Sequence, residues 1–236
     1  GSDAESRVWL TVHSGSRRLG LEVAKHNHAQ ALAMNRADGV MLPHEDLAFL
    51  PEGTPEFEAY TEALAYCLDW AMENRRRMGE AMAAALADAL GRRVSMEETL
   101  NVHHNVADQE RHLGRKVWVH RKGATPAEAG VRGLIPGHMG LGSYLTTGLG
   151  SEDSYMSSSH GAGRAMGRNV AKRTLDIESE KAKLDAAGVT LWTPGGYRTA
   201  LDEMPGAYHE PGLVMERQSD LVHVEGLLRS VGTVKG

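Results

Sequence analysis

The sequence predicts an α+β fold, with a single domain over residues 1–236. In the first half of the chain, apolar residues recur at the three- and four-residue spacing of amphipathic helices. In the second half, short β-branched and apolar runs break into glycine-rich loops, and helices and strands do not alternate with the spacing of βαβ units. The hydrophobic fraction of 41% and the charged fraction of 24% are those of an ordinary globular protein.

In the N-terminal half we expect a strand followed by helices. Val8–Val12 is a β-branched, apolar run and predicts a buried strand that ends in a polar loop. A helical segment follows at about Gly20–Met34. Thr54 supplies an N-cap and Pro55 a first-turn proline, and together they predict a helix that reaches about Leu90.

Two further features belong to this half. Ser95 and Glu98 form a capping-box pattern, which predicts a short helix into residues 101–105. Cys67 falls on the apolar stripe of the long helix, where a small core residue is expected. It is the only cysteine, so an internal disulfide is excluded and a reducing compartment is favoured. With no apolar run of membrane-spanning length either, we expect a cytoplasmic protein.

Strands and glycine loops dominate from Lys116 onward. Strands are predicted over residues 116–120 and 133–136, and the second breaks into a Pro-Gly loop. A Ser/Gly loop over residues 157–164 leads into a predicted helix over 165–175. A last helical stretch is expected near residues 213–230.

Histidine and glycine are the unusual parts of the composition. There are 12 histidines, and the 27 glycines cluster in short loops, which favours a site built on loops because glycine lets backbone N–H groups approach an anion. The formal net charge of −5 argues against a protein that coats nucleic acid non-specifically. It leaves room for a local basic groove.

The loop around His160 is the most informative segment. Three serines precede this histidine, and the sequence Gly161-Ala162-Gly163 follows it. A helix predicted directly after the loop would present its N-terminus to phosphate, and an imidazole beside a bound phosphate can attack phosphorus. The alternative is a histidine that only makes hydrogen bonds within a glycine-rich turn.

Other loops carry candidate ligands. His13 and His104 each follow a regular element and are candidate metal ligands, although two histidines alone do not define a site. The loop from Pro136 to Gly140, with Ser143 after it, is a candidate nucleotide cradle or simply a turn. Three cations flank these loops and are candidates for contacts with phosphate or RNA, or for solvated surface charges: Arg17, Lys122 and Arg164.

Taken together, these segments resemble the RtcB family of GTP-dependent RNA ligases in order and spacing. The matching stretches are HSGSRRLG at 13–20, HHN at 103–105, RKGA at 121–124, PGHMG with SY at 136–144, SHGAGR at 159–164, DEMPGAY at 202–208 and the terminal VKG. The resemblance covers the chain from about Val8 to Gly236. It implies an RtcB-like fold and an enzyme that joins RNA 3′-phosphate or 2′,3′-cyclic phosphate ends to 5′-hydroxyl ends through a histidine–GMP intermediate, in tRNA splicing or RNA repair.

The resemblance also implies roles for individual residues. His160 is the residue that carries GMP, GTP and two Mn²⁺ ions are the cofactors, and His13 and His104 are metal ligands. RNA is the implied partner, and the accessory protein archease serves some family members. The implied nucleotide contacts are His104, Asn105, Pro136, Gly137, His138, Met139, Ser143, His160, Gly161, Ala162, Gly163, Tyr208 and Lys235.

The chain departs from the family pattern in ways that bear on activity. His138 stands where the family usually has serine, and His209 stands where it often has lysine. The family's aspartate and cysteine metal ligands precede the HSGSR motif, whereas this chain begins twelve residues before that motif with Gly-Ser, as a cut fragment would. We therefore expect the C-terminal portion of an RtcB protein, inactive as an isolated chain. The rival interpretation is a truncated paralogue that binds guanine nucleotide or RNA without ligating.

Overall fold

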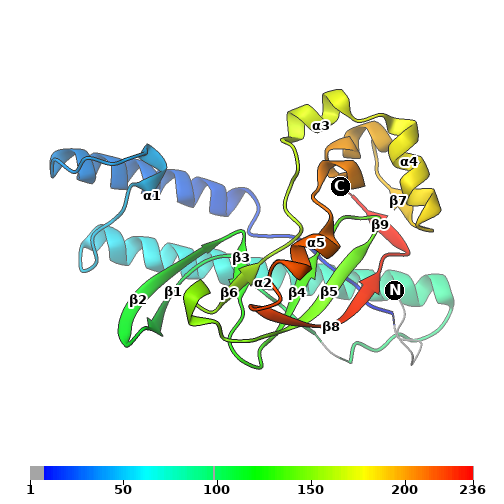
Figure 1. Ribbon diagram of the computed structural model, residues 1–236, viewed down its shortest axis with the longest axis horizontal. Helices are drawn as coiled ribbons and strands as arrows, with labels where there is room; N and C mark the ends of the chain where they lie inside the picture. The colour runs from blue at the N-terminus through cyan, green and yellow to red at the C-terminus, as the bar shows by residue number, and fades with distance from the viewer. Residues whose placement is uncertain (1–7, 98, 236) are drawn as a thin grey trace. The chain divides into compact units, whose positions relative to one another are not determined.

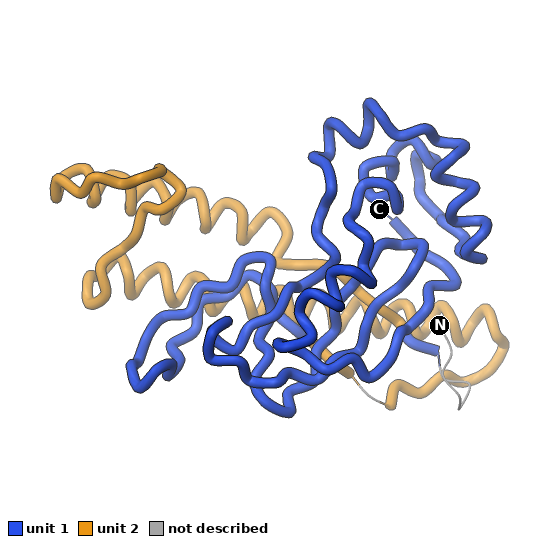
Figure 2. Tube along the Cα trace, in the orientation of Figure 1, with its two compact units in different colours: residues 1–9, 102–236 blue, residues 10–101 orange. Residues whose placement is uncertain are grey.

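The computed structural model describes residues 8–97 and 99–235, and it mixes helices and strands as the sequence predicts. The chain forms two compact units (Figure 2). Unit 1 contains residues 1–9 and 102–236, and unit 2 contains residues 10–101. Every candidate residue from His104 to Lys235 therefore belongs to unit 1, whereas the HSGSR motif belongs to unit 2.

In its described residues, unit 2 contains two α-helices, α1 (Arg18–Ala37) and α2 (Pro55–Leu90), with a short 3-10 helix, η1 (Glu45–Leu47), between them. The predicted start of α2 is confirmed, because Thr54 Oγ accepts a hydrogen bond from the Phe57 N–H at 3.2 Å. The helix continues without a break to the left-handed Gly91. Cys67 is buried, as expected for a core residue.

Two predictions for this part of the chain are wrong. Val8 forms only a single bridge and residues 9–15 are not a strand, because no strand among the described residues continues the pairing. Residues 95–97 and 99–103 are not helical, and Glu98 lies outside the described residues. A capping box contributes only about 1 kcal/mol, too little to support a short helix that has no apolar face to pack.

The described residues of unit 1 form four small sheets, whose strands are labelled in Figure 1. The hairpin of β1 (Asn105–His112) and β2 (Arg115–Lys122) is antiparallel, as is the pair of β3 (Ala124–Pro126) and β6 (Ser157–Ser159). The three-stranded sheet contains β4 (Arg132–Pro136), β5 (Gly142–Gly148) and β8 (Val222–Arg229) in that order, and β7 (Thr190–Trp192) pairs in parallel with β9 (Gly232–Val234). The predicted strands over 116–120 and 133–136 are confirmed within β2 and β4.

The helix expected near residues 213–230 is only partly correct. A helix, α5 (Pro211–Glu216), covers the start of this stretch, and the remainder is mostly β8. Met215 of α5 and Val222 of β8 are buried together with Ile135 of β4. The apolar residues of this stretch therefore enter one core, some from a helix and some from a strand. Gly226 in the stretch was a signal against a continuous helix, since glycine costs about 1 kcal/mol in a helix interior.

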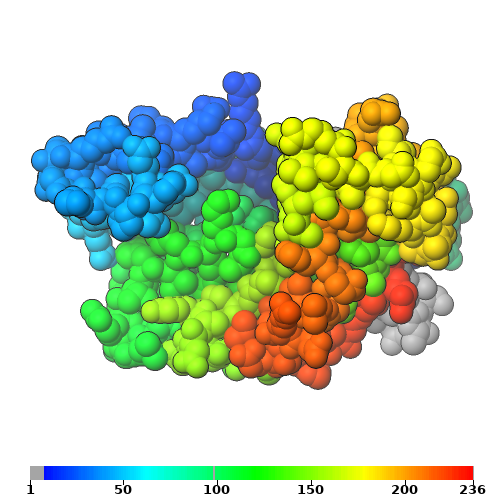
Figure 3. All heavy atoms as spheres, turned by 45° about the horizontal axis from the view of Figure 1, so that its top comes forward, coloured from blue at the N-terminus to red at the C-terminus, as the bar shows by residue number. Residues whose placement is uncertain are grey.

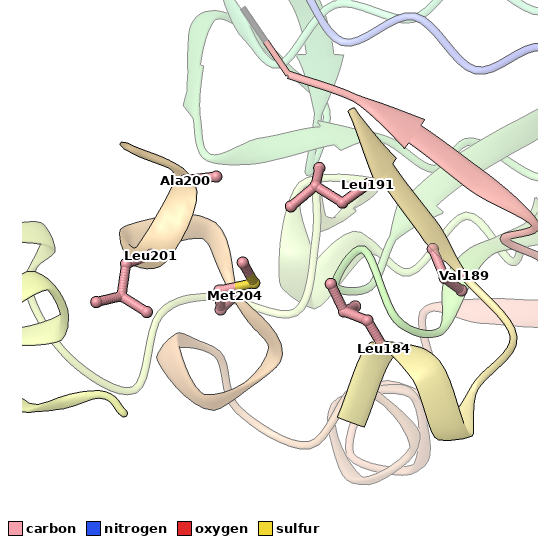
Figure 4. Packing of buried hydrophobic residues seen from close by; sticks show 6 residues of the cluster. All are labelled: Leu184, Val189, Leu191, Ala200, Leu201 and Met204. Atoms are coloured by element: carbon pink, nitrogen blue, oxygen red, sulfur yellow. The ribbon is translucent and has the colours of Figure 1, made fainter. Parts of the chain in front are cut away.

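A second core lies among short helices of unit 1. These are α3 (Arg168–Thr174), α4 (Ile177–Ala186), η3 (Tyr197–Glu203) and η4 (Pro205–Ala207). Leu184, Leu191 and Met204 point toward one another at its centre (Figure 4). The yellow spheres of α3 and α4 lie against the orange spheres of η3 (Figure 3). The remaining 3-10 helix, η2 (Glu152–Ser154), precedes β6.

The helix expected after the His160 loop begins later than the sequence suggests. The α3 helix starts at Arg168, eight residues beyond His160, and Ala165–Gly167 intervene without helical structure. The helix N-terminus therefore does not follow the loop directly, and the donors beside His160 are those of the loop itself. Among the helices in the described ranges, none combines the length and the apolar character that crossing a membrane requires.

Candidate functional site

His160 lies where three segments of unit 1 meet. Its imidazole stacks on that of His104, with ring centroids 4.6 Å apart and ring planes 29° from parallel. His104 directly precedes β1, and His160 directly follows β6. In the described part of the chain, neither ring nitrogen of His160 makes a hydrogen bond within the protein, so a ring lone pair is available to react.

Gly123 holds these two histidines at that spacing. Its N–H donates to the His104 carbonyl at 3.0 Å, and its carbonyl accepts from the His160 N–H at 3.3 Å. Gly123 has a φ of +74°, a conformation that side chains disfavour, and an added Cβ would lie 3.5 Å from the His160 ring. The glycine of the RKGA motif therefore lets the backbone run directly beside the imidazole.

The serine before His160 is held by a residue that belongs to none of the sequence motifs. Gln218, buried after α5, donates from Nε2 to Ser159 Oγ at 2.8 Å and accepts from the Ser159 N–H at 3.0 Å. This two-point contact fixes the backbone on the N-terminal side of His160. A lone glutamine far from any motif carries no signal that would have identified it.

The Pro-Gly loop contacts the other side of the His160 loop. The Ala162 N–H donates to the Pro136 carbonyl at 3.0 Å, and a Cβ at Gly161 would lie 3.1 Å from the same oxygen. Gly137 donates to the Gly142 carbonyl at 2.8 Å, which closes the loop as a tight turn. Ser143 is buried and pairs with Pro136 across β4 and β5.

His138 and Met139, at the tip of this turn, face toward protein. Met139 packs against the core formed by the short helices. Burial lowers the pKa of His138 against the opposing influence of Glu210 and Glu180. Its Nδ1 is buried without a hydrogen-bond partner among the described residues. The His138 carbonyl accepts from Leu141 and Gly142, so the turn that its backbone forms does not depend on the side chain.

Tyr208 joins the His160 loop to the DEMPGAY motif. Arg164 pairs with Tyr208 in an isolated bridge, and its guanidinium lies 5.1 Å from the centroid of the tyrosine ring. Gly163 accepts a hydrogen bond from the His209 N–H at 3.1 Å. The predicted residues Gly161, Ala162 and Gly163 therefore lie in a segment that is joined by these contacts to the segment of Tyr208.

Glu203 organises this end of the site and was not singled out from the sequence. Its carboxylate accepts from the Tyr208 hydroxyl and lies 3.8 Å from Lys235 Nζ. Arg168 Nη1 lies 2.5 Å from it, and Arg164 Nη1 lies 3.8 Å from it. The adjacent acidic residues Asp202 and Glu203 of DEMPGAY could have indicated this cluster. Two carboxylates beside a conformationally restricted Met-Pro-Gly turn attract cations.

The ionisation of this cluster follows from its contacts. Burial opposes the charge on Glu203, but the hydrogen bond from Tyr208 and the charges of Lys235 and Arg168 lower its pKa overall. Burial, followed by the hydrogen bond to Glu203, raises the pKa of Tyr208 to about 12. At neutral pH Tyr208 is therefore a neutral phenol that donates to a carboxylate.

Several residues predicted for the site take no side-chain part in the contacts described above. His13 and Arg17 belong to unit 2, where His13 is exposed and Arg17 has a φ of +57°. Asn105 and Lys122 face each other in the first pair of the β1–β2 register, exposed and adjacent to His104 and Gly123. In the described ranges, no group of three histidine, cysteine, aspartate or glutamate side chains is placed to hold a metal ion.

Comparisons with known proteins identify the family of this chain. The family described as tRNA-splicing ligase RtcB matches residues 2–236. The RNA-splicing ligase RtcB of Escherichia coli K12 is 37% identical over 246 residues, which cover 99% of this chain and 57% of that protein. The tRNA-splicing ligase RtcB of Aeropyrum pernix is 30% identical, covering 98% of this chain and 53% of that protein. The chain thus spans a little over half the length of these relatives, and it belongs to the RtcB family of RNA-splicing ligases.

Proposed function

We propose that this chain supplies the guanylylated histidine and the guanine-binding residues of an RNA ligase. The ligase joins RNA 3′-phosphate or 2′,3′-cyclic phosphate ends to 5′-hydroxyl ends. Membership of a family of RNA-splicing ligases supports the reaction class. The observation that carries the residue assignment is the His160 imidazole, which lies among glycine loops with no hydrogen bond to its ring nitrogens in the described part of the chain.

In the proposed reaction, a ring nitrogen of neutral His160 attacks the α-phosphorus of GTP. The new N–P bond replaces the bond to pyrophosphate, which leaves. The GMP group then passes to the RNA 3′-phosphate, and His160 regains its lone pair. The RNA 5′-hydroxyl attacks this activated phosphate, loses its proton, and expels GMP. Stacking on His104 holds the nucleophile in one orientation throughout.

The cluster around Glu203 is the proposed guanine end of the site. Lys235 lies next to it at the C-terminal end of β9, and an ammonium there can donate to guanine O6, a group that adenine lacks. Tyr208 is held by its hydroxyl contact with Glu203, and its ring lies beside the Arg164 guanidinium. The Pro136 loop and the loop over Gly161–Gly163 supply glycines whose backbone allows close approach of phosphate.

Two Mn²⁺ ions are included in the proposal only because the RtcB family implies them, with His13 and His104 as ligands. The described residues do not fit a complete metal centre, because no group of three possible ligands is present among them. No step above depends on a metal held by this chain. The same observation favours the second candidate function, in which the chain binds guanine nucleotide or RNA without ligating.

Guanylylation tests the assignment of His160. The full-length protein is incubated with GTP labelled at the α-phosphate and with Mn²⁺, and the acid-labile, base-stable adduct is counted after gel electrophoresis. We expect the label to disappear in His160→Ala and to persist in His223→Ala, a matched change at an exposed histidine of β8. Label retained by His160→Ala would contradict the assignment, and wild-type protein that takes no label would contradict the proposed function.

A further inference from the structure

The β1–β2 hairpin separates charge between its two faces. Residues paired across antiparallel strands share a face, and alternate residues face opposite ways. One face, called here the open face, contains mostly exposed residues: Asn105, Ala107, Gln109 and Arg111 on β1, with Lys122, His120, Trp118 and Lys116 opposite them. The hairpin extends away from the strands β4, β5 and β8 of the same unit (Figure 1).

The open face is cationic in a chain that is acidic overall. It carries Arg111, Lys116 and Lys122 and no aspartate or glutamate, whereas the sequence as a whole has 31 acidic and 26 basic residues. All three cations are exposed, and none of them forms an ion pair with another described residue. The half-buried Trp118 lies between Lys116 and His120 along β2.

The opposite face contains a buried ion pair that anchors the hairpin. Arg121 is almost fully buried, and its guanidinium donates to both carboxylate oxygens of Glu110. His112 Nε2 donates to the same carboxylate at 2.7 Å. Arg121 also donates to Ser157 Oγ at 2.8 Å, and so ties the hairpin to the strand that precedes His160. Glu110 is therefore engaged on the opposite face, which also contains the exposed Asp108, and the charged residues of the open face are all basic.

We propose that the open face binds the single-stranded 3′-terminal segment of the RNA and leads it to His160. The inference rests on the proposed function, and it adds a binding surface outside the nucleotide site. The row from Lys116 to Lys122 covers about 20 Å at the rise of a β-strand. It ends at Lys122 and Asn105, next to Gly123 and His104 of the site.

Single-stranded RNA fits this surface better than an acidic protein does. Cations spaced along one strand follow a phosphate backbone, and the aromatic Trp118 among them offers a surface on which a base stacks. An acidic peptide would use the cations but gain nothing from the indole. A duplex would bury its bases and would likewise leave Trp118 unused.

Fluorescence anisotropy with the 236-residue chain tests the proposal. The probe is a fluorescein-labelled 12-nucleotide oligouridylate with a 3′-phosphate, titrated at several salt concentrations. For single strands the slope of log K against log salt is about −0.7 per phosphate contact. Arg111→Gln/Lys116→Gln should therefore reduce the slope by about 1.4 and weaken binding about 25-fold at 0.1 M salt. Trp118→Leu should weaken binding about tenfold, with the slope unchanged, and Trp118→Phe should restore most of the affinity.

Arg115→Gln is the matched control, because Arg115 is an exposed cation of the same hairpin on the opposite face. Its affinity and salt slope should equal those of the wild type, and thermal unfolding confirms that each variant is folded. Equal losses in Arg115→Gln, or wild-type binding by Arg111→Gln/Lys116→Gln, would overturn the proposal. So would competition by polyglutamate as effective as that by RNA. Guanylylation of His160 in the full-length protein is scored separately, so failure of the hairpin and failure of the proposed function are distinguishable.

Discussion

Removing the charge of Glu110 should destabilise unit 1 far more than removing the charge of any exposed acid. Glu110→Gln leaves the guanidinium of Arg121, which is 3% exposed as a residue, without its anionic partner. Breaking a buried ion pair on one side costs about 3–5 kcal/mol. Glutamine keeps one acceptor, and Arg121 retains its bonds to Ser157 and the Tyr155 carbonyl, so we expect about 3 kcal/mol.

The assay is thermal unfolding of the 236-residue chain at pH 7. For a chain of this size 1 kcal/mol shifts Tm by about 2–4 °C, so Glu110→Gln should lower the Tm of unit 1 by about 6–12 °C. The matched control is Glu73→Gln on α2. Glu73 also contacts two arginines, Arg76 and Arg77, which lower its pKa to about 2, but its side chain is 44% exposed and solvent screens the pair. We expect no measurable change there.

The pH dependence has a definite sign. The hydrogen bond from Arg121 lowers the pKa of Glu110 in spite of its burial, and the bond from His112 adds to this. A carboxylate whose folded pKa is depressed contributes stability that is complete above its unfolded pKa of about 4.3. That contribution is lost as the pH falls through the lower, folded pKa. The Tm difference between wild type and Glu110→Gln should therefore be constant from pH 7 to about 5 and shrink below that. A difference under 1 °C at pH 7, or one that grows on acidification, would refute the reasoning.

Three further predictions concern the candidate site. Glu203→Gln should lower the pKa of Tyr208 from about 12 toward the ordinary value near 10, because an anionic acceptor is lost while burial remains. NMR titration of ring-carbon-labelled tyrosine measures this pKa, and an unchanged value would argue against the contact. Gly123→Ala should lower the stability by about 1 kcal/mol or more, because Gly123 has a φ of +74°, and should slow guanylylation in the full-length protein. Gly114→Ala is the control, because Gly114 is also at positive φ but lies in the hairpin turn, and it should lower the stability alone. The isolated 236-residue chain should not join RNA ends in the presence of GTP and Mn²⁺, because two histidines give each ion few ligands and no negative charge; robust joining would contradict this.

The local parts of the fold were predictable from the sequence. Thr54, Pro55 and the apolar stripe that includes Cys67 predicted α2, because caps and helical periodicity act within a few residues of one another. The strands β2 and β4 were predictable for the same reason, from β-branched residues that break into glycine loops. The order and spacing of the motifs were also sufficient to identify the RtcB family.

What the sequence alone determined is therefore the family and the loops that carry its motifs, among them the loop that contains the candidate residue His160. Only the tertiary structure decided that β8 is a strand, because its pairing with β5, 70 or more residues away in the chain, replaces a helix that local pattern allowed. The same holds for the stack of His104 on His160, the support of Ser159 by Gln218, and the position of Glu203 among Tyr208 and Lys235. These contacts join residues far apart in sequence, and spacing along the chain contains no information about which distant side chains will share a burial site.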